Sequence, residues 1–138
     1  MSVGRGYTWS NLEKDTDPAL SSLEQARRIA ALAQEKLAED VVILDMRPVC
    51  TFTDYFVIAT GRNPRQTAAI WDEVHGRMKH EQELLPRTID GKQEGTWILA
   101  DYLDVVLHVF TPEARDYYKL EELWNDVPEV ELGTAVAG

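Results

Sequence analysis

Two carboxylates and a histidine stand out in "DYLDVVLHVF", a stretch with the composition of a β-strand. Asp101 and Asp104 flank an expected turn, and His108 lies inside the strand that follows. Carboxylates at a strand end can hold Mg²⁺, as in enzymes that transfer nucleotides, and Asp45 and Asp54 could supply a further ligand. One hypothesis is therefore a magnesium-dependent nucleotidyltransferase. It is disfavoured because the sequence has no Gly-rich phosphate loop with a following Lys-Ser/Thr.

Other reactive side chains lack the neighbours that catalysis needs. Cys50 is the single cysteine, which excludes an internal disulfide, and no histidine is near it in sequence, which favours a structural thiol. His75 and His80 fall on or near the end of an expected helix and are expected to be exposed. No Cys/His cluster has zinc spacing, and no nucleophile is evident for His108. The sequence therefore predicts no metal or other cofactor.

The segment that holds the two acids is expected to form a hairpin with two unlike faces. With Tyr102 and Leu103 as the turn residues, the cross-strand partners follow from the register. One face is apolar throughout and is predicted to be core: Ile98, Ala100, Val105, Leu107 and Val109. The mixed face pairs Asp101 with Asp104, Leu99 with Val106 and Trp97 with His108, and Phe110 extends it.

The mixed face has more than one interpretation. Aromatic residues beside charges are typical of a protein interface with an apolar centre and a polar rim. A tryptophan opposite a histidine is more often simple packing under a covering helix. A third alternative is self-association through the Trp97 face. Opposed acids are unfavourable by roughly a few tenths of a kcal/mol, so a metal, a partner's basic side chain or the turn's backbone amides would have to compensate.

Helix-start signals place three helices along the chain. The first is expected near Ser22, where Ser21 and Glu24, or Ser22 and Gln25, have capping-box spacing. Asn and Thr, each followed by proline, are typical of an N-cap and first helical position. These signals begin the second and third helices at 63–64 and 111–112.

Apolar, β-branched segments predict the strands between those helices. They are Asp40–Met46, Thr51–Thr60, an edge strand at Leu85–Ile89, and the two strands of the hairpin. The fold class is therefore α/β (α+β-like), with a mixed sheet of about five strands and helices packed on it. One domain is expected over 23–124, between a mobile N-terminal tail, 1–22, and a C-terminal tail, 125–138.

Charge limits the class of partner. The 138 residues carry a formal net charge of −10, whereas a protein that grips nucleic acid needs a basic surface. A basic protein partner would instead be attracted. No apolar stretch approaches the length of a membrane span, and the N-terminus lacks a signal-peptide core. A cytoplasmic protein without direct nucleic-acid or membrane binding is expected.

Three segments resemble the ribosomal silencing factors of the Iojap type: "EDVVILDM", "TDYFVIATGRNPRQ" and "TWILADYLDVVLHVFTPEARDYYKLEELW". The resemblance covers roughly Leu23 to Trp124. It implies a nucleotidyltransferase-like fold without the catalytic site, and no enzyme activity. It also implies binding to the fourteenth protein of the large ribosomal subunit, which blocks joining of the small subunit and represses translation when nutrients are short. Family members often form homodimers when free.

The resemblance also suggests a docking face that coincides with the mixed face of the hairpin. Many members have glycine at the position of Leu103, so a different turn, and a shifted pairing, is anticipated here. From Glu94 to Trp124 seven acids face two basic residues, which suits a basic ribosomal protein. The predicted docking residues are Trp97, Leu99, Asp101, Asp104, His108, Phe110 and Pro112, with Glu113, Arg115 and Tyr118 as weaker candidates.

Overall fold

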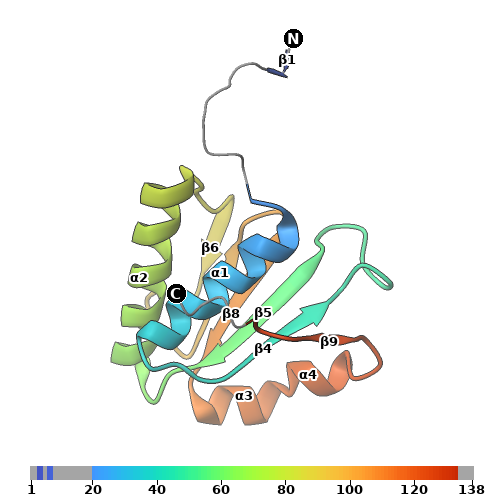
Figure 1. Ribbon diagram of the computed structural model, residues 1–138. Helices are drawn as coiled ribbons and strands as arrows, with labels where there is room; N and C mark the ends of the chain where they lie inside the picture. Colours follow the sequence, from blue (N-terminus) through green and yellow to red (C-terminus); the bar gives the residue numbers. More distant parts are fainter. Residues whose placement is uncertain (1–2, 5, 8–19, 134–138) are drawn as a thin grey trace.

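The computed structural model describes residues 3–4, 6–7 and 20–133 of the chain (Figure 1). The main sheet has six strands in the order β6-β7-β8-β5-β4-β9. The pair β5–β8 is parallel, and the other four pairs are antiparallel. The predicted mixed sheet with packed helices is therefore confirmed. The strands are β4 (Glu39–Asp45), β5 (Tyr55–Thr60), β6 (Thr88–Asp90), β7 (Trp97–Asp101), β8 (Val105–Phe110) and β9 (Glu129–Val130), and a separate parallel pair joins β1 (Val3–Gly4) and β2 (Gly6–Tyr7).

The sheet has a sixth strand, β9, where about five strands were expected. This strand lies in the segment that was predicted to be a C-terminal tail. β9 pairs with Ile43 and Leu44 of β4, and Val127 just before it is buried. The segment after Trp124 therefore begins as part of the packed domain. Much of the predicted N-terminal tail, by contrast, lies outside the described residues.

The predicted helix starts are confirmed by their caps. The helices are α1 (Ser22–Glu35), α2 (Pro64–Gln82), α3 (Pro112–Tyr118) and α4 (Leu120–Leu123). Ser21 and Glu24 form the capping box of α1. The side chains of Asn63 and Thr111 accept hydrogen bonds from the first turns of α2 and α3. Lys119, in the left-handed region at φ 48°, divides the predicted third helix into α3 and α4. Among the helices described here, none combines the length and the apolar composition of a membrane span.

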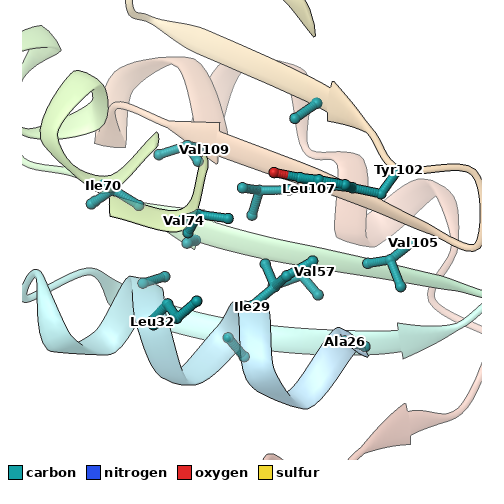
Figure 2. Packing of buried hydrophobic residues seen from close by; sticks show 14 of the residues in the cluster. Ala26, Ile29, Leu32, Val57, Ile70, Val74, Tyr102, Val105, Leu107 and Val109 are labelled. Atoms are coloured by element: carbon teal, nitrogen blue, oxygen red, sulfur yellow. The ribbon is translucent and has the colours of Figure 1, made fainter. Parts of the chain in front are cut away.

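The main core lies between one face of the sheet and the helices α1 and α2 (Figure 2). Side chains alternate between the two faces of a strand, so one set of alternate residues in β5, β7 and β8 enters this core. The predicted core residues Ile98, Ala100, Val105, Leu107 and Val109 are all fully buried there. The opposite face has a smaller core, where α3 and α4 pack over part of the sheet. The buried residues of this core are Leu44, Met46, Ile58, Phe110, Ala114 and Val127.

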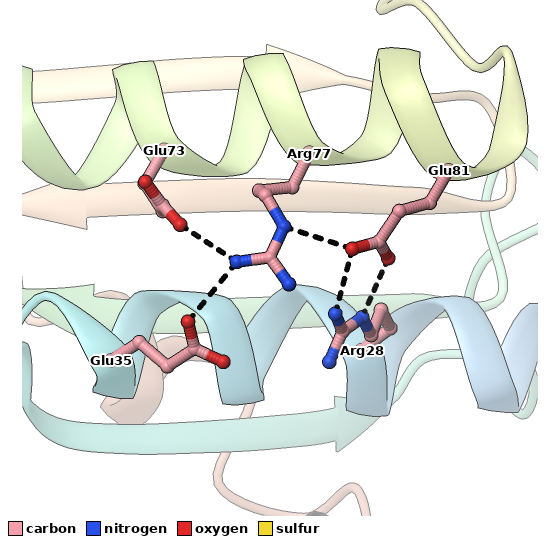
Figure 3. A network of polar contacts seen from close by, with 5 residues as sticks. All are labelled: Arg28, Glu35, Glu73, Arg77 and Glu81. Atoms are coloured by element: carbon pink, nitrogen blue, oxygen red, sulfur yellow. Dashed lines mark hydrogen bonds and ion pairs between the residues drawn. The ribbon is translucent and has the colours of Figure 1, made fainter.

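An ion-pair network joins α1 to α2 on the outside of the main core (Figure 3). Glu81 accepts two hydrogen bonds from Arg28, at 3.0 and 2.9 Å, and one from Nε of Arg77 at 2.8 Å. Arg77 also reaches Glu73 at 2.9 Å and Glu35 at 3.2 Å. Because one carboxylate bridges two guanidinium groups on different helices, Glu81 is the centre of the network.

Glu81→Gln is expected to lower the free energy of unfolding by about 1 kcal/mol at pH 7. In the parent, the hydrogen bonds from Arg28 to the Glu81 carboxylate lower the pKa of Glu81 below its ordinary value, and the hydrogen bond from Arg77 lowers it further. Such a carboxylate contributes stability above its unfolded pKa and loses it as the pH falls through the folded pKa. Urea unfolding of the parent should therefore show a loss of stability below about pH 5, and Glu81→Gln should show a smaller loss. Equal losses in the two proteins would contradict a role for the network.

A matched control lies at the end of the same helix. Glu83 is exposed and forms no ion pair with any described residue. Glu83→Gln removes one negative charge without touching the network, so its unfolding should follow the parent at each pH.

Candidate functional site

The β7–β8 hairpin has a different turn from the predicted one. The turn residues are Leu103 and Asp104, because the amide of Tyr102 donates to the carbonyl of Val105 at 2.9 Å. Leu103 takes a positive φ of 81°, and the Asp101 carboxylate accepts from its amide at 2.8 Å. The predicted cross-strand pairs are therefore wrong by two residues. The observed pairs include Trp97 with Phe110, Leu99 with His108 and Asp101 with Val106.

The two acids of the hairpin do not oppose each other as predicted. Asp101 pairs with Arg87 of the segment before β6, at 2.9 Å. Asp104 is exposed in the turn, and its main-chain carbonyl accepts from the amides of Asp54 and Tyr55. The repulsion between opposed carboxylates therefore does not arise.

The structure does not assemble the acids of the magnesium hypothesis into one ligand set. Arg47 binds the Asp45 carboxylate at 2.9 and 2.8 Å, and its hydrogen bonds lower the pKa of Asp45. Asp54 accepts from the Ser22 hydroxyl at 2.8 Å. Across residues 20–133, no group of three or more His, Cys, Asp or Glu side chains is placed to hold a metal ion.

An open apolar groove lies on the part of the second sheet face that α3 and α4 leave uncovered. Its volume is about 260 Å³. Phe52, with 80% of its surface exposed, belongs to the loop before β5, while Arg87 and Asp101 supply the ion pair at its edge. The lining residues are Cys50, Phe52, Thr53, Phe56, Arg87, Leu99, Asp101, Val106 and His108.

His108 is buried within the aromatic cluster of this face. Its Nδ1 accepts from Nε1–H of Trp97 at 3.1 Å, and the centroids of the Phe56 and His108 rings are 4.7 Å apart with the ring planes at 62°. Burial lowers the pKa of His108 to about 3. The imidazole is therefore neutral at physiological pH and acts through packing and hydrogen bonding rather than through charge.

Trp97 joins the groove to the aromatic surface of α3. Its half-buried ring lies 4.7 Å from that of Tyr118, which is 53% exposed, and 4.9 Å from that of Phe110. Phe110 itself is fully buried, because it belongs to the core formed with α3. Phe110, predicted as a docking residue, therefore has no exposed surface for contact with a partner in this structure, whereas Trp97 and Tyr118 are accessible.

The remaining predicted docking residues lie outside the groove. Arg115 is largely buried, with 12% of its side chain exposed. It donates to the carbonyl of Asp40 at 2.7 Å and to the hydroxyl of Thr60 at 2.6 Å, and it pairs with Glu121. These contacts fasten α3 to β4, β5 and α4, so Arg115 is structural rather than free for docking. Pro112 borders the polar cavity around Arg115, and Glu113 is exposed nearby at the start of α3.

Sequence reasoning missed the groove residues contributed by other segments. The predicted strand Thr51–Thr60 begins only at Tyr55, so Phe52 lies in a loop. Phe56 faces the groove because β5 pairs with β8 in parallel, with Phe56 beside Val106. The alternation within "YFVIAT" could have shown that Phe56 and Ile58 share a face, but not which strand lies beside them.

Comparison with known proteins gives a consistent result. The family model described as "Ribosomal silencing factor during starvation" matches residues 19–137. The chain is 39% identical to the ribosomal silencing factor RsfS of Bacillus subtilis, over 75% of this chain and 86% of that protein. It is 33% identical to the mouse protein named mitochondrial assembly of ribosomal large subunit protein 1, over 70% of this chain and 43% of that one.

A solved structure shares the fold. A crystal structure of a protein from Chromobacterium violaceum superposes with a TM-score of 0.74 at 28% identity, covering 77% of this chain and 88% of the other. The family match spans residues 19–137, which include the six-stranded sheet that carries the groove.

Proposed function

This chain belongs to the family of ribosomal silencing factors, and we propose that it binds the large ribosomal subunit and prevents the small subunit from joining. Membership supports a ribosome-associated role in assembly or in repression of translation. The finer proposal is that docking occurs on the fourteenth protein of the large subunit, mainly under nutrient limitation. The bound chain then occupies the contact surface and excludes the small subunit sterically, with no covalent step.

The observation that carries this proposal is the continuous aromatic and apolar surface on one side of the sheet. It runs from Tyr118 over Trp97 to the groove around Leu99 and ends at the exposed Phe52. Exposed apolar surface of this kind, with a polar rim, marks interaction sites on proteins. We call this surface the docking face, and define it by Phe52, Phe56, Trp97, Leu99, Asp101, Val106, His108 and Tyr118.

Charge favours a basic protein over bare RNA as the partner. The chain carries a net charge of −10, so it is repelled by phosphates and attracted by the basic surfaces that ribosomal proteins present. Asp104 is exposed beside the docking face, and Asp101 shares its carboxylate with Arg87. A basic side chain of the partner can pair with either acid. The similarity to a bacterial silencing factor, over 86% of that protein, supports the further proposal that the chain acts in the cytoplasm.

Sedimentation with purified subunits tests the binding step. The parent protein should travel with isolated large subunits and not with isolated small subunits, and the bound fraction should fall as salt is raised, because salt screens the charge attraction. Equal association with both subunits, or with neither, would contradict the proposal. Either result would make the nucleotidyltransferase the next hypothesis to test, by calorimetric titration with nucleotide and Mg²⁺.

A homodimer of the free chain is a further part of the proposal. The docking face exposes aromatic side chains that a second copy can cover, and Phe52 and Tyr118 are both more than half exposed. Light scattering of the parent should then give the mass of a dimer, and Trp97→Ala should shift it toward the monomer. A Trp97→Ala protein that stays dimeric would show that the dimer uses another surface.

A further inference from the structure

One polar atom of the docking face has no partner. Nε2 of His108 is buried and forms no hydrogen bond with any described atom. The residue is 3% exposed and lines the groove, while its other ring nitrogen is occupied by Trp97. Buried polar groups are almost always hydrogen-bonded, so an unpaired one calls for an explanation.

The bond from Trp97 fixes which nitrogen of His108 carries hydrogen. An indole N–H can only donate, so Nδ1 of the imidazole is an acceptor and bears no proton. The ring is neutral, because burial lowers its pKa to about 3, and its single hydrogen therefore lies on Nε2. The unpaired atom is thus a buried N–H donor on a residue that lines an apolar groove.

The surroundings of this donor select the chemistry of its acceptor. A carboxylate or phosphate would lose its hydration among Phe56, Leu99 and Val106, and the net charge of −10 opposes it. Ammonium and guanidinium groups have no acceptor atom. A neutral oxygen can accept the hydrogen bond and carries no charge that would lose its hydration. The commonest neutral oxygen on a protein is a main-chain carbonyl.

We propose that the docked ribosomal protein places a main-chain carbonyl oxygen on Nε2–H of His108. This inference rests on the proposed function, because it names what the partner presents to the same face. Trp97 is then a positioning residue: its N–H holds the imidazole in the tautomer that presents a donor to the groove. Because Nε2 is buried in the free chain, admitting the oxygen requires a neighbouring side chain to move, and Phe56 is the candidate: it is half-buried, lines the groove and has its ring 4.7 Å from the imidazole.

Three substitutions at His108 test the donor, with purified large subunits as the probe and co-sedimentation titration as the measurement. His108→Leu removes the donor and is expected to weaken binding about 10-fold, the worth of one hydrogen bond. His108→Gln carries an amide N–H to the position of Nε2 and should stay within about 3-fold of the parent. His108→Asn reaches only the position of Nδ1, so it should resemble His108→Leu. Thermal unfolding of each variant establishes that it is folded.

Nitrogen NMR of the free parent measures which ring nitrogen of His108 carries hydrogen, a property that a purely packing role would leave undetermined. The imidazole should show hydrogen on Nε2, and Trp97→Phe should allow both tautomers, because the indole donor is gone. A free parent with hydrogen on Nδ1 would overturn the inference.

Binding outcomes separate this inference from the proposed function. If the parent binds and folded His108→Leu binds equally well, the inference is overturned, because the complex then gains nothing from the Nε2–H donor. Equal weakening in His108→Leu and His108→Gln would also overturn it, by assigning the loss to ring packing. If the parent itself does not bind large subunits, the proposed function fails and takes this inference with it.

Discussion

Phe110→Ala is expected to lower the free energy of unfolding by about 3–5 kcal/mol, the cost of truncating a fully buried phenylalanine. Phe110 has no exposed surface and packs with Ile58 and Ala114 in the core beneath α3. The cavity would loosen the contact between α3 and the sheet. Urea unfolding followed by circular dichroism measures the loss.

Tyr117→Ala is the matched control for Phe110→Ala. Tyr117 lies on α3 and is 78% exposed, so its truncation should change the free energy of unfolding by no more than about 0.5 kcal/mol. A Phe110→Ala protein as stable as the parent that fails to bind large subunits would instead show that Phe110 is a surface anchor, as the sequence suggested.

Trp97→Ala is expected to weaken binding to large subunits about 30-fold or more, corresponding to at least about 2 kcal/mol for a central aromatic residue. Trp97 stacks on Phe110, lies against the tilted ring of Tyr118 and donates to His108, so its loss removes apolar contact area and frees the imidazole. Co-sedimentation titration at fixed salt gives the two dissociation constants.

Leu37→Ala controls for the loss of an exposed apolar side chain elsewhere. Leu37 is 67% exposed and follows α1, the helix that packs on the opposite face of the sheet. Its variant should bind as the parent does. A Trp97→Ala protein that binds as tightly as Leu37→Ala would place the contact with the ribosome on another surface.

The sequence predicted which hairpin residues share a face, although it predicted the wrong partners. The observed pairing is shifted by two residues, and an even shift leaves every side chain on its own face. The resemblance anticipated a shifted pairing at Leu103, but the turn residues themselves were predicted wrongly, because Leu103 adopts a positive φ that leucine rarely takes. The Asp101 carboxylate supports that conformation by accepting from the Leu103 amide, a contact that propensity rules do not contain.

Tertiary packing explains the other differences from the predicted site. Phe110 belongs to the mixed face as expected, but α3 folds back and covers it. Phe52 and Arg87 reach the groove from segments distant in sequence from β7 and β8, so no local pattern links them. β9 is only two residues long, too short for a period-two signal to be visible. Long elements with caps, such as α2, were predictable because their signals are local.

A subunit-joining assay shows whether the docked chain excludes the small subunit. Equal amounts of large and small subunits are mixed with excess parent protein under conditions that favour association, and whole ribosomes are measured by sucrose-gradient sedimentation. The parent should travel with free large subunits and reduce the whole-ribosome peak, while Trp97→Ala at the same concentration should leave that peak intact. A parent protein that travels with undiminished whole ribosomes would show that the docked chain does not exclude the small subunit.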